Sequence, residues 1–367
     1  NLVIVNCMTF KNVRFSAPLK GGAIFLLSLL CAIGCQKKSQ GSASAENVLP
    51  SIEQAVANVE TQAAPAVTQS INTQPAAAPV AADATATSTP TGLRFVGYNV
   101  ANWLILDERY DFDTRISEKN APKPEKEKAA VVSIVSAEKP DVFGVCEIGT
   151  KDDLIDIQTR LKAAGVDLPH LHYSGGMDTT RHLGLLSRFP IVSTAVVADQ
   201  KYKINGKEYG MQRGVLDATV KTPDGRLWRF LGVHLKSKRD VEDGDQNQMR
   251  INEAQLLRKH IDEILKADPQ ARLINYGDFN DTRRTSPLKI IQGPYNSPRG
   301  MNPIGLHDSR YEYWTHFWER EDVYSRFDYI MFSQALKKDV VFEECKILDP
   351  ENWDAASDHR AVLGVFR

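Results

Sequence analysis

The 367-residue sequence lacks the motifs that define several common enzyme classes. It has no GxGxxG, P-loop, GxSxG or HExxH motif, so the usual signatures of dinucleotide binding, nucleotide hydrolysis, serine hydrolases and zinc proteases are absent. Its formal net charge is −1, which excludes a global basic field that would attract nucleic acid. From Cys35 onward only three cysteines remain, and no two of them have zinc-ligand spacing.

Residues 1–91 contain no tryptophan, tyrosine or histidine, so the chemistry belongs to the remainder of the chain. Residues 21–34 carry no charge and follow a flank that contains Lys11, Arg14 and Lys20. Because a membrane span needs roughly 20 apolar residues, this shorter run is typical of the central region of an export signal.

The apolar run ends in Ala-Ile-Gly-Cys at residues 32–35, which resembles a bacterial lipobox. We therefore expect a signal peptide over residues 1–35, with Cys35 as the lipid anchor, in a protein exported to the bacterial cell envelope. Attachment to the membrane through this lipid and secretion both fit an export signal. The alternative is an ordinary signal peptide that happens to contain a cysteine.

Residues 36–91 are rich in Ala, Pro, Thr, Ser and Gln and contain no aromatic residue. Such a segment cannot bury enough apolar surface to offset the entropy of ordering its backbone. We predict a disordered tether here and a catalytic domain over residues 92–367.

The catalytic segment alternates between strand and helix patterns. Helices are predicted over 123–139, 151–164 and 247–266, and strands over 93–100, 141–147, 181–188, 213–220, 226–235, 271–274 and 325–331. Two packed sheets with helices outside would accommodate this α/β order. For Cys146 and Cys345 the alternatives are a disulfide or free thiols, and the apolar strand around Cys146 favours a buried thiol.

The segment Asn-Tyr-Gly-Asp-Phe-Asn-Asp at residues 275–281 follows a predicted buried strand. Gly277 permits a sharp turn there, and Asp278 and Asn280 are spaced so that both side chains can enter one cleft. A carboxylate and an amide in that position could hold a water, a metal ion or a phosphate. A turn capped by these side chains is the structural alternative.

Further polar residues lie at the ends of other predicted strands, namely Asn99, Glu147, His234 and Asp328, and Asp358 and His359 lead into the final apolar strand. Each could be a capping residue or a satisfied ion pair when it is considered alone. Several buried carboxylates at strand ends, however, cost folding free energy unless they share a cation or bond one another.

In residues 92–367 these positions occur within the motifs YNV, VCE, LLSR, GVHLKS, GDFN, SRFDYI and SDH, in that order. The segment thereby resembles the endonuclease/exonuclease/phosphatase (DNase I-like) superfamily of metal-dependent phosphodiesterases. The resemblance implies a four-layered α/β sandwich, with two facing mixed sheets between helices. It also implies that Glu147 is the main ligand of Mg²⁺ or Mn²⁺, with Ca²⁺ as a further option, and that Asp358 and Asn99 lie nearby.

The resemblance also assigns the catalytic residues. Asp278 and Asn280 would hold or activate the attacking water, and His359, oriented by Asp328, would contact the scissile phosphate. His234 would protonate or stabilise the leaving oxygen.

One position departs from the family pattern. Repair-type members often carry an acid where this chain has Ala101, and Asn102 could substitute for that acid through a water. We expect substrate phosphates to contact Arg181, Arg213 and Lys236, and additional basic candidates are Lys238, Arg239, Arg283, Arg284 and Arg326.

The resulting expectation is an extracytoplasmic nuclease that acts on DNA or RNA, as a monomer with no protein partner. A phospholipid or small-molecule phosphoesterase is the alternative within the enzyme class. A catalytically inactive surface binding module is the alternative outside it.

Overall fold

The computed structural model describes residues 92–111, 114–242 and 244–367. These residues lie in one compact unit, Ala81–Arg367. The predicted signal peptide, the anchor at Cys35 and the tether lie outside the described residues. No helix in the described ranges is both long enough and apolar enough to cross a bilayer.

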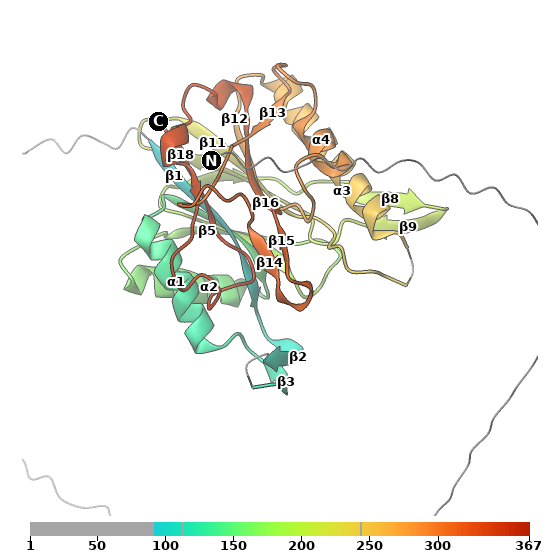
Figure 1. The fold of residues 1–367 in the computed structure, drawn as a ribbon. Helices are drawn as coiled ribbons and strands as arrows, with labels where there is room; N and C mark the ends of the chain where they lie inside the picture. The colour runs from blue at the N-terminus through green and yellow to red at the C-terminus, as the bar shows by residue number, and fades with distance from the viewer. Residues whose placement is uncertain (1–91, 112–113, 243) are drawn as a thin grey trace, which may run out of the picture. The chain divides into compact units, whose positions relative to one another are not determined.

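Two six-stranded mixed sheets form the centre of the domain (Figure 1). The first has the order β17-β18-β1-β4-β6-β5, with β1 Leu93–Trp103, β4 Val142–Ile148, β5 His170–Ser174, β6 His182–Ser187, β17 Lys346–Ile347 and β18 Val362–Phe366. The second has the order β13-β16-β12-β11-β10-β7, with β7 Ile191–Thr194, β10 Val215–Lys221, β11 Leu227–His234, β12 Arg272–Asp278, β13 Met301–Pro303 and β16 Asp328–Ser333. Parallel pairs β1–β4 and β11–β12 lie at the centre of the two sheets.

Aromatic side chains from both sheets meet in the core between them. The ring of Phe95 on β1 lies 4.8 Å from that of Tyr276 on β12 and 5.3 Å from that of Phe230 on β11. Gly144 on β4 makes room for this packing, because a Cβ there would lie 2.1 Å from the Tyr276 ring. The two sheets therefore interlock tightly enough to fix the positions of their strand ends.

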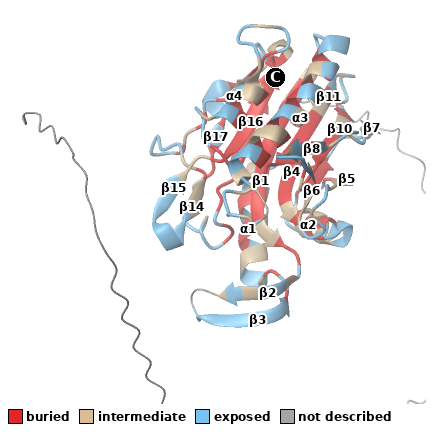
Figure 2. Cartoon of the chain, turned by 90° about the vertical axis from the view of Figure 1, so that its right-hand side faces the viewer, coloured by how far each residue is buried: buried red, intermediate tan, exposed pale blue. Residues whose placement is uncertain are grey.

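Helices cover the outer faces, with α1 Glu125–Glu138 and α2 Lys151–Ala163 on the first sheet and α3 Gln246–Ala267 and α4 Ser286–Gln292 on the second (Figure 1). Thr150 begins α2 with a capping box, and Leu154, Ile157 and Leu161 form its buried face at helical spacing. Most strands of the two central sheets and the inner helix faces are buried, while the outer helix faces are exposed (Figure 2). The predicted four-layered sandwich is confirmed.

Smaller elements complete the domain. Three two-stranded hairpins are β2 Leu106–Asp111 with β3 Ile116–Ala121, β8 Lys201–Ile204 with β9 Lys207–Gly210, and β14 His316–Trp318 with β15 Val323–Ser325. Three 3₁₀ turns are η1 Glu319–Glu321, η2 Gln334–Leu336 and η3 Phe342–Glu344.

The strand predicted over 325–331 was wrong in part, because it divides between β15 and β16. Cys146 and Cys345 are buried free thiols, so the disulfide alternative is not formed.

Candidate active site

Strand register aligns three of the predicted residues across the second sheet. His234 on β11 is opposite Asp278 on β12, and Asp278 is opposite Asp328 on β16. In the first sheet, the register of β1 shifts after Asn99 and that of β4 shifts around Glu147. Such irregularities re-aim side chains at strand ends, and here they turn both residues toward the edge shared with the second sheet.

The Asn99 amide joins the two sheets at this edge. Its Nδ2 donates to Glu147 Oε1 at 3.2 Å and to Asp278 Oδ2 at 3.1 Å, and it lies 3.4 Å from His359 Nε2. Its Oδ1 accepts from the Ala101 N–H at 3.1 Å. One buried amide therefore contacts two carboxylates and an imidazole that are far apart in the sequence.

His359 forms a close pair with Asp328, with 2.8 Å between Nδ1 and Oδ2, and both residues are buried. Its Nε2 lies 3.6 Å from Asp278 Oδ2. Burial alone would lower the pKa of His359, but the charges of Asp328 and Asp278 outweigh it and hold this pKa well above its usual range. The carboxylates accordingly favour the protonated ring, which has one nitrogen anchored and the other directed into the cluster.

The imidazole of His234 has the opposite electrostatic character. Its Nε2 lies 3.5 Å from Asp278 Oδ2 and 3.8 Å from Glu147 Oε1. Burial lowers the pKa of His234 well below its usual range, and the nearby charge of Arg213 lowers it further. The pKa values of the two histidines in the cluster are therefore shifted in opposite directions.

Asp278 is held by the turn that follows β12. The Asn280 N–H donates to its Oδ1 at 2.8 Å, while Asn280 Nδ2 donates to the Leu235 carbonyl at 3.0 Å. Burial raises the pKa of Asp278 to about 7, although the charge of His359 opposes this shift. Gly277 has φ +132°, and a Cβ there would lie 1.9 Å from the Val233 carbonyl oxygen, so the turn requires glycine.

Glu147 has an unusual backbone for a glutamate, with φ 67°. Its Oε2 accepts from the Asn102 N–H at 3.0 Å, and Asn102 and Ala101 also have positive φ values of 62° and 47°. Such conformations persist in non-glycine residues only where surrounding structure imposes them, and they concentrate at functional sites. Asn102 was predicted to replace an acid through a water. In the structure its side-chain oxygen instead accepts a hydrogen bond from Arg181 Nε at 2.8 Å, which competes with that water.

Asp358 is directed toward His316, a residue that the sequence did not single out. Its Oδ2 lies 3.7 Å from His316 Nε2, and one ligand atom from each of His316, Asp358 and His359 lies within 4.8 Å of the others. His316 reaches the cluster because β14 forms a bridge to His359. It sits in no recognisable motif, so only this long-range pairing reveals it.

The donor set suits a divalent cation. Glu147 and Asp278 place carboxylate oxygens against the same amide, and the side chain of Glu147 remains 16% exposed. Carboxylate oxygens are ligands that Mg²⁺, Mn²⁺ and Ca²⁺ prefer, and a cation would offset the repulsion between these acids. The Asn99 amide faces both acids with its nitrogen and accepts from the Ala101 N–H with its oxygen, so that oxygen would reach a cation only after the amide group turned over.

The three predicted substrate contacts differ in how accessible they are. Arg181 lies beside the cluster, with its Nε 3.9 Å from Glu147 Oε2. Arg213 is buried against Asp178 at 3.3 Å. Lys236 is also buried, and its amine donates to the carbonyls of Ser237 and Arg239 at 3.2 Å and 3.3 Å. Of these three residues, only Arg181 lies beside the cluster and keeps its charged group partly exposed.

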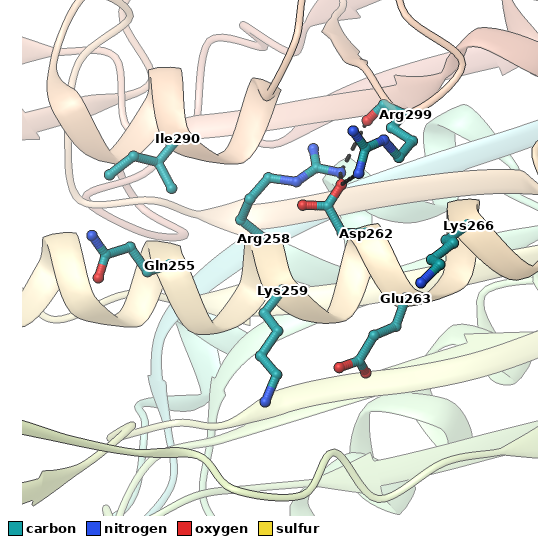
Figure 3. A pocket seen from close by; sticks show the side chains of 8 residues that line it. All are labelled: Gln255, Arg258, Lys259, Asp262, Glu263, Lys266, Ile290 and Arg299. Atoms are coloured by element: carbon teal, nitrogen blue, oxygen red, sulfur yellow. Dashed lines mark hydrogen bonds and ion pairs between the residues drawn. The ribbon is translucent and has the colours of Figure 1, made fainter.

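A groove of about 370 Å³ lies elsewhere, between α3 and α4 (Figure 3). Its central charges are paired, since Arg258 donates to Asp262 at 3.0 Å and Arg299 lies 3.7 Å from the same carboxylate. None of the strand-end residues lines it. It offers no chemistry comparable to that of the strand-end cluster.

A family model for the Endonuclease/Exonuclease/phosphatase family matches residues 111–359. The chain belongs to this family. It is therefore a phosphoester hydrolase, and members of the family are typically dependent on a divalent metal.

Solved structures show the same fold. An endonuclease/exonuclease/phosphatase from Bacteroides vulgatus has a TM-score of 0.53 and 15% identity, with 76% of this chain and 99% of that chain covered. The human Nocturnin catalytic domain with bound sulfate has a TM-score of 0.52 and 16% identity, over 75% and 94% of the two chains. D. rerio TDP2 complexed with single strand DNA product has a TM-score of 0.51 and 18% identity, over 76% and 99%. No curated protein matches the chain in a sequence search.

Proposed function

We propose that this family member is a divalent-metal-dependent nuclease that hydrolyses phosphodiester bonds of DNA or RNA. The observation that carries the proposal is the Asn99 amide, which contacts Glu147, Asp278 and His359 at one edge of both sheets. Acids, an amide and imidazoles gathered in this way can bind a cation and a phosphate together. The complex of D. rerio TDP2 with single strand DNA product supports a nucleic-acid substrate.

Glu147 is proposed as the main metal ligand, with Asn99, which contacts it, and Asp358, which lies beside His316 and His359, as further ligands. When bound, the cation neutralises the phosphate and stabilises the charge that develops on it. The chain's own contribution is to fix Glu147, through the Asn102 N–H, before the substrate arrives. Arg181, which donates to Asn102, adds a positive charge beside Glu147.

Asp278 is proposed to accept the proton of the attacking water, with Asn280 orienting its carboxylate. His359, charged and anchored by Asp328, would donate from Nε2 to a non-bridging phosphate oxygen. Because burial favours the neutral form of His234, we assign it hydrogen-bond donation to the leaving oxygen, in preference to full proton transfer.

The sequence motif at Cys35 supports an extracytoplasmic role, and we propose that the enzyme is exported and anchored to the cell envelope through that cysteine. Extracellular DNA or RNA would then be the substrate within its reach. Labelling with a palmitate analogue should mark the wild-type chain and not Cys35→Ala. An unlabelled wild-type chain, or a labelled variant, would contradict the anchor.

The catalytic proposal is tested with bis-p-nitrophenyl phosphate and metal-free enzyme to which Mg²⁺, Mn²⁺ or Ca²⁺ is added. Glu147→Gln and His359→Ala should each lower kcat/KM at least about 100-fold, as expected for loss of a charged transition-state contact. His170→Ala, on the edge strand β5, is the matched histidine control and should retain activity. Near wild-type turnover in Glu147→Gln would contradict the assignment.

Substrate class is tested with a panel of single-stranded DNA, RNA, sphingomyelin and phosphomonoesters. Cleavage of either nucleic acid with no hydrolysis of sphingomyelin is expected. The opposite result would refute the nuclease and favour the lipid phosphoesterase. Binding without turnover of any panel member would favour the inactive binding module.

A further inference from the structure

A hollow of about 560 Å³ lies where the loop after β12 meets the edge strand β13. Its lining includes Arg283, Arg284, Tyr295 and the carboxyl-terminal end of α4. It contains none of the strand-end residues of the catalytic cluster.

The two arginines in this hollow have no acidic partner. Within the described ranges no carboxylate lies within ion-pair distance of Arg283 or Arg284, and both residues are exposed. By contrast, Arg250 in the same region pairs with Asp281 at 3.1 Å. Two unpaired guanidinium groups that line one hollow form a ready site for an anion, and their planar geometry suits phosphate.

The hollow is connected to the catalytic edge by a fixed loop. Arg283 follows Asn280 by three residues, and the intervening Asp281 is held by Arg250 and by Lys238 at 3.3 Å. On the other side, β13 pairs with β16. The loop after β12 therefore carries residues of both the catalytic cluster and the hollow.

The pairing of β13 with β16 also gives the distance between the hollow and the catalytic residues. Pro303 is opposite Met331, three residues along β16 from Asp328. The β13 residues that line the hollow are opposite positions three to five residues along β16 from Asp328, which corresponds to about 10–17 Å, so the hollow lies within a few nucleotides of the catalytic residues.

Tyr295 supplies a second, independent feature. Its side chain lines the hollow and is 88% exposed. An aromatic ring left open next to unpaired arginines is the combination that binds single-stranded nucleic acid, in which bases stack on rings while cations follow the backbone. A duplex keeps its bases stacked internally and could not use the ring in this way.

We propose that this hollow is a second subsite for single-stranded nucleic acid. Arg283 and Arg284 bind phosphates beyond the scissile linkage, and Tyr295 stacks on a base. The inference rests on the proposed nuclease function and specifies its substrate as a strand that extends past the cleavage position.

Binding is measured by fluorescence anisotropy with a labelled 12-nucleotide oligothymidylate, on the full domain in EDTA so that no cleavage occurs. The Arg283→Ala/Arg284→Ala variant should bind at least ten-fold more weakly. The slope of its plot of log association constant against log salt concentration should be less negative by about 1.4, because each neutralised phosphate of a single strand contributes about 0.7 to that slope. Tyr295→Ala should weaken binding roughly 5- to 150-fold with an unchanged salt slope.

The matched control removes the same charge at the opposite end of β16. Lys337 and Lys338 are exposed and adjacent, and Lys337→Ala/Lys338→Ala should keep wild-type affinity and salt slope. All substituted side chains are exposed, and circular dichroism confirms that each variant is folded. Wild-type affinity and slope in both the arginine and the tyrosine variants would overturn the subsite.

Two further measurements separate this inference from the proposed function. Relative to wild type, the arginine variant should lose at least ten-fold more kcat/KM on the oligonucleotide than on bis-p-nitrophenyl phosphate, which is too small to reach the hollow. Wild-type protein that hydrolyses neither substrate would refute the nuclease, whatever the binding result. Tyr295→Ala weakening a duplex as much as a single strand would overturn the single-strand assignment.

Discussion

Replacing Asn99 with alanine should destabilise the metal-free enzyme more than any change at the surface. The side chain donates to two carboxylates, Glu147 and Asp278, at 3.2 Å and 3.1 Å, and is itself 1% exposed. Alanine leaves both acids facing each other without the donor between them. The loss therefore includes the hydrogen bonds and the unscreened repulsion that they offset.

The magnitude follows from the charge on each acceptor. A hydrogen bond to a charged group contributes about 1.5–3 kcal/mol, and two would contribute about 3–6 kcal/mol. Because the pKa of Asp278 is raised to about 7, that acceptor is charged only part of the time at neutral pH, which favours the lower half of this range. We expect a loss of about 4 kcal/mol. At 2–4 °C per kcal/mol for a domain of this size, Tm should fall by about 8 °C or more.

Differential scanning calorimetry at pH 7 in EDTA, and again with excess Mg²⁺, measures this effect. The deficit should be larger with Mg²⁺, because the variant lacks a proposed metal ligand and is stabilised less by the ion. Asn252→Ala is the control, since that side chain donates only to a backbone carbonyl within α3, and it should change stability by no more than about 0.5 kcal/mol. A Tm within about 2 °C of wild type for Asn99→Ala in EDTA would refute the reasoning.

Two other substitutions test the framework around the site. Gly277→Ala places a methyl group 1.9 Å from a backbone carbonyl at φ +132°, and it should lower the free energy of unfolding by about 2–6 kcal/mol and remove most activity. Gly206→Ala, at φ +82° in open space, is the control and should lower it by about 1 kcal/mol. Equal losses for the two variants in chemical denaturation would contradict this prediction. For Asp217, burial would raise the pKa, but hydrogen bonds from His260 and Arg229 lower it overall. Its stabilisation is therefore present above the unfolded value of about 3.9 and is lost as pH falls below it. Asp217→Asn should lose about 2 kcal/mol at pH 7, and a deficit that does not narrow below pH 4 would argue against the ion pair.

The sequence predicted the layers of the fold and the strand-end residues because both depend on local patterns. Apolar runs such as Ala271–Ile274 identified buried strands, and a polar residue at the end of each run marked a position at the sheet edge. The actual end of β12 is Asp278 itself, so the strand continues through the predicted turn. The error is small, since Gly277 allows the last two residues to remain in register with β11.

Accessibility could not be predicted in the same way. Lys236 follows His234 in the chain and appeared suited to a phosphate, yet it is buried. The reason lies on α3, where the buried carboxylate of Glu253 accepts from the Lys236 N–H at 2.6 Å and draws this segment inward. His316 illustrates the converse, because a bridge between distant segments brings it to the cluster. Both outcomes depend on contacts between residues that no local pattern connects.

The segment at residues 101–102 explains how the cluster is held ready for its ligands in the absence of an acid at position 101. Its N–H groups orient Asn99 and Glu147, and its positive φ values cost on the order of 1–3 kcal/mol for each residue. Lys123 offsets this cost by donating to the Ala101 carbonyl at 3.3 Å, and Arg109 by donating to the Asn102 carbonyl at 2.9 Å. Cations behind the segment thus fix a backbone that in turn fixes the proposed metal ligands. This arrangement makes the geometry of Glu147 a property of the folded chain before any metal binds.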